Sequence, residues 1–262
     1  MNIRGKPSIL QKLVFELRYK YGFTYLDQCG RTVNKIMSEQ PEWILRSDMP
    51  NPQNAPLVSI RNTCSFNFSA LKLSFNLEMP LGGEPLDDKD VAEFTGQVDS
   101  VSAIVIEHLG LKHFTRIGIR VWYLFPAESK EDAEEWLQGL KSYSISDDLL
   151  SAFAGKTEAT GVTVFMSGED RKFRVAFNGV ERLGSVDLGE GILNIKASSL
   201  SKDQDRFLKE QIRTKRRMLH NPEYAAMIDV DAFLDDPASV EPQDFIERSM
   251  KQISENLVTA LK

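Results

Sequence analysis

Apolar residues along this chain recur with two different periods, so the sequence predicts a mixture of strands and helices. The strongest apolar run, residues 114–125, predicts a strand. Residues 65–78 alternate apolar and polar positions and predict a second strand, with a slip near Ala70 that suits a bulge or a turn. Between these two segments, residues 87–109 carry apolar side chains at helical spacing and predict a long helix.

The remaining elements follow the same two patterns. Short apolar or alternating runs predict further strands, and segments with apolar residues three or four apart predict further helices. The predicted strands are residues 13–19, 57–62, 162–166, 172–177, 192–197 and 225–233, and the predicted helices are residues 25–38, 130–140, 201–219 and 242–261.

Serine, threonine and glycine accumulate between residues 140 and 160, and we place a boundary there. It divides the chain into an N-terminal half, residues 1–145, and a C-terminal half, residues 146–262, which ends in a long amphipathic helix. The predicted fold class is α+β. Each half is expected to be a mainly antiparallel sheet with helices packed on one face, similar to a split β-α-β arrangement.

Length and composition are those of an ordinary globular protein. The chain has 262 residues, of which 42% are hydrophobic and 27% are charged. Its two cysteines, Cys29 and Cys64, are too few and too far apart for a disulfide framework or a zinc site, which favours a reducing compartment. The sequence shows no signal peptide and no apolar run long enough to span a membrane. We therefore expect a cytoplasmic protein.

Charge is distributed unevenly along the chain. The formal net charge is −6, which disfavours a general nucleic-acid binder. Residues 202–217 nevertheless contain seven basic and three acidic residues, whereas residues 221–247 contain eight acidic residues and no lysine or arginine. A helix in the basic segment would form one basic stripe from Arg206, Lys209, Arg213 and Arg217. Such a stripe can dock nucleic acid or an acidic protein, or it can be solvated or pair with the acidic segment that follows.

Two arginines in the strand of residues 114–125 are a candidate ligand-binding pair. Alternation places Arg116 and Arg120 on the same face of the strand, with Gly118 between them. Two guanidinium groups beside a glycine can bind a carboxylate or a phosphate. The alternative is that each arginine pairs with an acid of the fold, such as Glu16 or Glu107, and balances charge on the sheet.

Asp229 and Asp231 are a candidate metal-binding pair. They share one face of a predicted strand, and paired carboxylates hold Mg²⁺ in several phosphoryl-transfer enzymes. The chain lacks a phosphate-binding loop of the G-x-x-x-x-G-K-[ST] type, however, and Asp235 and Asp236 follow closely. A plain acidic surface is therefore the alternative interpretation.

Three short motifs occur together over nearly the whole chain. An opening strand carries Glu16 and Arg18, a later strand carries the run from Arg116 to Arg120, and Ile228-Asp229-Val230-Asp231 precedes the last helix. Together they resemble a sporadically distributed family of bacterial proteins of unestablished function. That family has an R-x-G-[LI]-R strand and a D-x-D strand before its C-terminal helix. The resemblance implies a two-part α+β fold and no particular reaction.

The sequence departs from the pattern of this family at two places. Trp122 and Tyr123 stand where a Tyr-Ile-Asn stretch is usual, and the usual histidine before the last helix is missing.

No catalytic motif is evident in the sequence, and no cofactor is indicated. We carry two hypotheses for function. In the first, the chain is a non-enzymatic binding protein for another protein or an acidic partner, with nucleic acid disfavoured by net charge and a homo-oligomer possible. In the second, it is a Mg²⁺-dependent enzyme that binds a nucleotide or phosphate through the Arg116/Arg120 and Asp229/Asp231 pairs.

Overall fold

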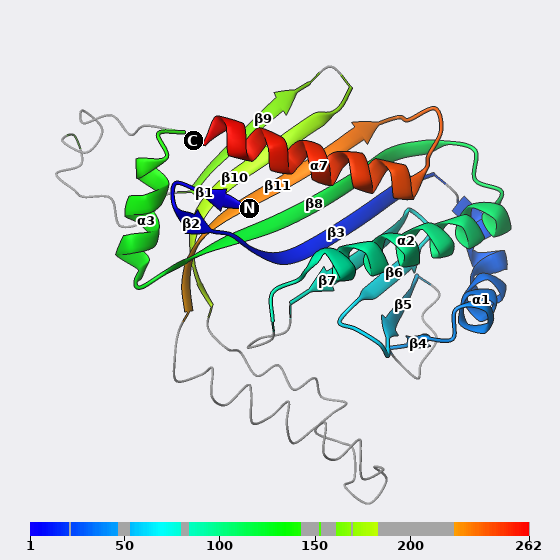
Figure 1. Cartoon of the computed structure of the whole chain (residues 1–262). Coiled ribbons are helices and arrows are strands. Elements are labelled where there is room, and N and C mark those ends of the chain that lie inside the picture. Colours follow the sequence, from blue (N-terminus) through cyan, green and yellow to red (C-terminus); the bar gives the residue numbers. More distant parts are fainter. Residues whose placement is uncertain are drawn as a thin grey trace, which may run out of the picture.

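In the computed structural model, nine of the eleven described strands form one antiparallel sheet, and the described helices lie on one side of it (Figure 1). The structure describes residues 1–20, 22–46, 53–79, 84–142, 152, 161–168, 170–182 and 223–261. The predicted strand at 192–197 and the predicted helix at 201–219, with its basic stripe, lie outside these ranges.

Nine strands form the main sheet, in the order β4-β5-β6-β7-β3-β8-β11-β10-β9. Their bounds are β3 (Ile9–Tyr19), β4 (Trp43–Leu45), β5 (Asn54–Ser59), β6 (Ser65–Ser69), β7 (Lys72–Glu78), β8 (Phe114–Ala127), β9 (Gly161–Ser167), β10 (Lys172–Arg182) and β11 (Glu223–Asp235). A separate two-stranded ribbon consists of β1 (Asn2–Ile3) and β2 (Lys6–Pro7).

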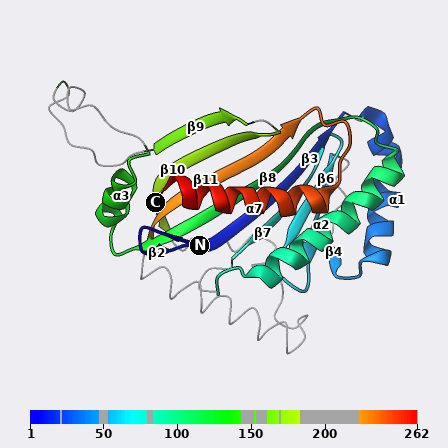
Figure 2. The same ribbon diagram turned by 45° about the horizontal axis from the view of Figure 1, so that its top comes forward.

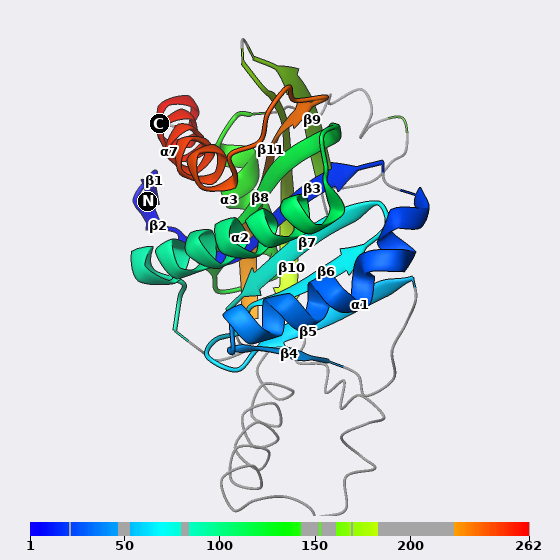
Figure 3. The same cartoon turned by 90° about the vertical axis from the view of Figure 1, so that its right-hand side faces the viewer.

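Four helices in the described part of the chain accompany this sheet: α1 (Gly22–Glu39), α2 (Asp88–Leu109), α3 (Lys130–Gly139) and α7 (Pro242–Ala260). Figures 2 and 3 show α1, α2 and α7 lying side by side over the same face of the sheet. The shorter α3 covers one end of that face, where Trp136 stacks on Phe125 at 4.5 Å between ring centroids. None of the described helices is both long enough and apolar enough to cross a membrane.

The predicted α+β class is confirmed. Strands from both predicted halves share one sheet, because β8 pairs with β11 from Arg116 opposite Asp235 to Ala127 opposite Tyr224. Two separate sheets, one for each half, are thus not seen in the described residues. The boundary at residues 145 and 146 stays a prediction, since residues 143–151 lie outside the described ranges.

The hydrophobic core lies between the sheet and the helices. Alternate residues of the central strands point into it, among them Phe15 of β3 and Ile119 of β8, which are fully buried. On the side of β4 to β7, the aromatic rings of Trp43, Phe66 and Phe75 contact one another, with centroid distances of 4.7 to 6.1 Å. Because close-packed interiors have low compressibility, this core restricts the motion of the sheet and so helps to fix the positions of residues on its other face.

Local sequence signals explain the best-defined helix, α2. Asp87 and Asp90 form a reciprocal capping box at its start, and Gly110 ends it in the left-handed conformation with a φ of 58°. The slip near Ala70 is a turn: the hydroxyl of Ser69 accepts hydrogen bonds from the backbone N–H groups of Leu71 and Lys72, and β6 and β7 become two strands.

Candidate functional site

The face of the main sheet that carries none of the described helices, here called the helix-free face, holds the candidate site. Alternation directs Arg116, Gly118 and Arg120 of β8 to this face. The neighbouring strand β11 directs Asp229 and Asp231 to it, because Asp231 is the register partner of Arg120. The two pairs predicted from the sequence are therefore neighbours in space.

Asp229 binds two arginines from two different strands. Its carboxylate accepts hydrogen bonds from Nε and Nη2 of Arg120 at 2.8 and 2.6 Å, and from Nη1 of Arg174 of β10 at 2.8 Å. The Asp229 side chain is only 2% exposed, whereas those of Arg120 and Arg174 are 39% and 27% exposed. A buried carboxylate thus holds two guanidinium groups that remain partly accessible from solvent.

Arg116 forms the second ion pair, with Asp231. Its Nη2 donates to Oδ2 of Asp231 at 2.6 Å, and its guanidinium lies 3.9 Å from the centroid of the Phe233 ring. Gly118 makes this arrangement possible, since a Cβ there would lie 3.2 Å from Cβ of Phe233 and 3.4 Å from Nε of Arg116. We call Arg116, Arg120, Arg174, Asp229 and Asp231 the Arg–Asp cluster.

Burial and pairing act in opposite directions on the two aspartates. Burial of Asp229 acts to raise its pKa, but the hydrogen bonds and charges of Arg120 and Arg174 outweigh it, so the pKa is lowered. Burial raises the pKa of Asp231, because the nearby charges of Arg116 and Arg120 do not fully compensate for it and the charge of Asp229 adds to the rise. The hydrogen bonds that Arg120 donates to Asp229 are also the main cause of the raised pKa of Arg120. Asp229 is therefore firmly ionised at neutral pH.

The charges continue across the helix-free face beyond this cluster. Lys12 pairs with Glu78 at 2.7 Å and lies 4.6 Å from the ring centroid of Trp122, and Glu16 pairs with both Arg18 and Lys72. Among the described side chains of this face in β3, β7, β8, β10 and β11, seven are basic (Lys12, Arg18, Lys72, Arg116, Arg120, Lys172 and Arg174) and five are acidic (Glu16, Glu78, Asp229, Asp231 and Asp235). A chain with a net charge of −6 thus has a locally basic surface here.

The ion-pair interpretation of Arg116 and Arg120 agrees with the contacts, although the partners are Asp231 and Asp229 instead of Glu16 or Glu107. Whether the two arginines also bind a ligand stays a prediction. The same holds for Mg²⁺ at Asp229 and Asp231. The described residues contain no group of three or more acidic, histidine or cysteine side chains placed to hold a metal ion.

Arg174 is the member of the Arg–Asp cluster that the sequence did not single out. A signal was present, because Arg174 occupies a polar position of the predicted strand at 172–177. Its role depends on the pairing of β10 with β11, in which Arg174 stands opposite Asp231, and that pairing could not be derived from periodicity. The basic stripe of Arg206, Lys209, Arg213 and Arg217 lies outside the described residues, so its prediction is untested.

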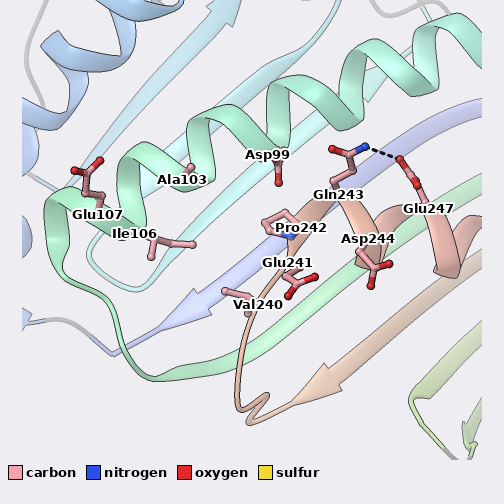
Figure 4. Close-up of a pocket in the computed structure, with 10 residues that line it drawn as sticks. All are labelled: Asp99, Ala103, Ile106, Glu107, Val240, Glu241, Pro242, Gln243, Asp244 and Glu247. Carbon is pink, nitrogen blue, oxygen red and sulfur yellow. Dashed lines mark hydrogen bonds between the residues drawn. The ribbon is translucent and has the colours of Figure 1, made fainter.

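Two hollows lie on the helix-covered side, and neither is lined by a residue of the Arg–Asp cluster. The first, of about 640 Å³, lies between α2 and the start of α7. Figure 4 shows the carboxylates around it, which belong to Asp99, Glu107, Glu241, Asp244 and Glu247. The second, of about 530 Å³, lies beside β9 and the end of α7 and has a mainly apolar lining.

Comparisons of this chain with protein-family models, with curated proteins and with solved structures found no match. The resemblance to the sporadically distributed bacterial family stays a prediction on the motifs alone.

Proposed function

We propose that this chain is a binding protein that docks an acidic segment of a partner protein on the helix-free face, at the Arg–Asp cluster. The observation that carries the proposal is the sharing of one carboxylate, Asp229, by Arg120 and Arg174. Because the cluster contains three arginines and two aspartates, it keeps one unbalanced positive charge.

The guanidinium groups of the cluster keep free donors. Arg120 uses Nε and Nη2 for Asp229, and Arg174 uses only Nη1. Nη1 of Arg120 and two nitrogens of Arg174 have no hydrogen-bond partner in the described part of the chain. A guanidinium fork that is already oriented by a buried carboxylate can bind a second carboxylate with little loss of side-chain entropy.

The surrounding surface favours the same kind of partner. Trp122 lies beside Arg120 and Lys12, with 5.2 Å between Cζ of Arg120 and the ring centroid, so apolar area and positive charge occur together. Interfaces between proteins are enriched in arginine and aromatic residues of this type. A partner segment that carries acidic residues next to apolar ones would match this surface.

The alternative, a Mg²⁺-dependent enzyme, is less compatible with these contacts. Both carboxylate oxygens of Asp229 accept hydrogen bonds from guanidinium groups. A Mg²⁺ ion at this place would have to replace those donors and would be repelled by the charges of Arg120 and Arg174. We therefore favour binding without catalysis.

The pairing of β8 with β11 supports the resemblance to the bacterial family. The R-x-G-[LI]-R motif and the D-x-D motif of that family lie more than 100 residues apart in this chain. They nevertheless form two ion pairs with one another, Arg116 with Asp231 and Arg120 with Asp229. The residues of both motifs thus belong to one group of ion-paired side chains, and on this ground we propose that the chain belongs to the family.

A salt-titrated binding assay tests the proposed function. Two probes are used. The first is fluorescently labelled poly-L-glutamate, which stands for an acidic segment, and the second is labelled single-stranded DNA of the same length. We expect the wild-type protein to bind poly-L-glutamate at low salt and to lose it as salt rises, since exposed ionic contacts are screened.

The decisive variant replaces Asp229 and both of its arginine partners by apolar residues of similar volume: Arg120→Met, Asp229→Leu and Arg174→Met together. It should remain folded and lose poly-L-glutamate binding. The control variant Arg248→Gln with Lys251→Gln removes two basic residues from α7 that are 70% and 77% exposed, and it should bind as the wild type does. Preference for DNA, or equal binding by both variants, would contradict the proposal.

A further inference from the structure

The two outer strands of the main sheet differ strongly. At one end, β4 has three residues, so it offers little backbone for pairing. At the other end, β9 has seven residues, Gly161-Val162-Thr163-Val164-Phe165-Met166-Ser167, and pairs with β10 on one side only within the described residues. Figures 1 and 2 show β9 at the margin of the sheet.

β9 lacks the features by which proteins usually prevent their edge strands from pairing. It contains no charged residue, no proline and no register shift against β10. Three of its apolar side chains are accessible, with exposed fractions of 38% for Val164, 72% for Phe165 and 45% for Met166. A free edge of this composition is suited to adding a further strand.

The apolar hollow of about 530 Å³ lies directly beside this edge. Val164 and Met166 of β9 line it together with Phe173 of β10 and with Leu257 and Leu261 at the end of α7. Side chains brought in by a further strand at β9 would extend the apolar layer of the sheet along this hollow. The edge and the hollow therefore belong to one surface.

We propose that this surface pairs with a second copy of the same chain, through antiparallel β9 strands related by a twofold axis at Val164. A strand without charges can face its own copy without repulsion between like charges. When the full length of β9 pairs with itself, Val164 faces its own copy, Val162 faces Met166, and Thr163 faces Phe165. The pair of Thr163 with Phe165 joins a β-branched and an aromatic side chain, which is a favourable cross-strand combination, and none of the pairs contains a charge.

The same arrangement limits the assembly to two chains. The twofold arrangement uses both β9 edges and leaves only the two β4 edges, each of three residues, at the ends of the joined sheet. An open row of sheets would need a second long edge on each chain. The described strands provide no such edge, so the assembly closes as a dimer.

Charge reversal at the twofold position tests this pairing. In the V164K variant and in the V164E variant, two like charges face each other at the axis, and each protein alone should sediment as a monomer at concentrations at which the wild type is a dimer. An equimolar mixture of the two variants should restore the dimer, because lysine then faces glutamate. The Leu71→Lys variant, which changes a residue that is 67% exposed in the β6–β7 turn, should dimerise as the wild type does.

A measurement on the wild-type protein covers the case in which the variants fail to fold. Amide hydrogen exchange of residues 161–167 should be slow at high protein concentration and become faster on dilution, while exchange in β8 stays the same. A wild-type protein that is monomeric at all concentrations, exchange in β9 that does not depend on concentration, or dimerisation of V164K alone would overturn the proposal.

Discussion

The two faces of the main sheet are held together by different forces, although they alternate along the same strands. On the helix-covered face, side chains such as Phe15, Phe75 and Ile119 are fully buried and need only suitable size and shape. On the helix-free face, Asp229 needs Arg120 and Arg174 at hydrogen-bonding distance. The first face provides stability through burial, and the second places charged groups in fixed positions.

This difference makes the helix-free face the more sensitive to the loss of a single group. A buried charge that loses its partners costs far more than an exposed ion pair contributes. We expect the core to tolerate substitutions of similar volume, and we expect the Arg–Asp cluster to tolerate the loss of Asp229 best when Arg120 and Arg174 are replaced with it. The predictions below separate these two kinds of behaviour.

The largest effect is expected for the double variant Arg120→Met with Arg174→Met. It leaves the carboxylate of Asp229, which is only 2% exposed, without both of its partners, and the free energy of unfolding should fall by about 3 to 5 kcal/mol, as measured by urea denaturation. The matched control is Lys172→Met on the same strand and face as Arg174, which removes a half-exposed partner of Asp235 and should cost less than about 1 kcal/mol.

Replacing Asp229 together with both arginines should restore most of the lost free energy of unfolding. In the triple variant with Arg120→Met, Asp229→Leu and Arg174→Met, no uncompensated charge remains, and stability should return to within about 2 kcal/mol of the wild type. A triple variant as unstable as the double variant Arg120→Met with Arg174→Met would show that the charged groups themselves, and not their balance, hold this part of the sheet.

A smaller effect is expected when one methyl group is added at Gly118. In Gly118→Ala the new Cβ meets Phe233 and the Arg116 side chain at 3.2 and 3.4 Å, and stability should fall by about 1 kcal/mol. The same change at Gly96, in the middle of α2, meets no atom within 4 Å and should increase stability by up to about 1 kcal/mol. Thermal unfolding should show a lower melting temperature for Gly118→Ala and a higher one for Gly96→Ala. A lower melting temperature for Gly96→Ala would contradict the packing argument.

The smallest effect concerns acid titration and has opposite signs for the two aspartates. The lowered pKa of Asp229 means that its ionised form stabilises the fold above the unfolded-state pKa near 3.8, and this stabilisation is lost as pH falls through the folded-state pKa. The raised pKa of Asp231 means that its ionised form costs stability at neutral pH, and protonation removes that cost as pH falls.

Urea denaturation at a series of pH values measures this difference. The stability difference between wild type and Asp229→Asn should shrink below pH 3.8, because the wild type loses its advantage there. Relative to Asp231→Asn, the wild type should gain stability as pH falls. Parallel pH profiles for the two variants would contradict the opposite environments of the two carboxylates.

The sequence predicted the elements that have strong periodicity and missed what depends on strand pairing. The strand at β8 and the helix at α2 were found because apolar spacing and capping residues act locally. β4, with three residues, is too short to show a period. Ion pairing of Arg116 and Arg120 with an acid such as Glu16 or Glu107 was an open alternative, but Asp229 and Asp231 were not identified as the partners. These pairs join strands more than 100 residues apart and require the register of β8 with β11.

The position of β8 between β3 and β11 has a consequence for the synthesis of this protein. Its partner on one side, β3, precedes it in the chain, but its partner on the other side, β11, begins about 100 residues later, at Glu223, which corresponds to roughly 5 to 20 s of translation. During that interval one edge of the longest strand in the main sheet, together with its apolar side chains, is without its native neighbour. We expect the nascent chain to be most prone to aggregation, and most dependent on chaperones, during this period.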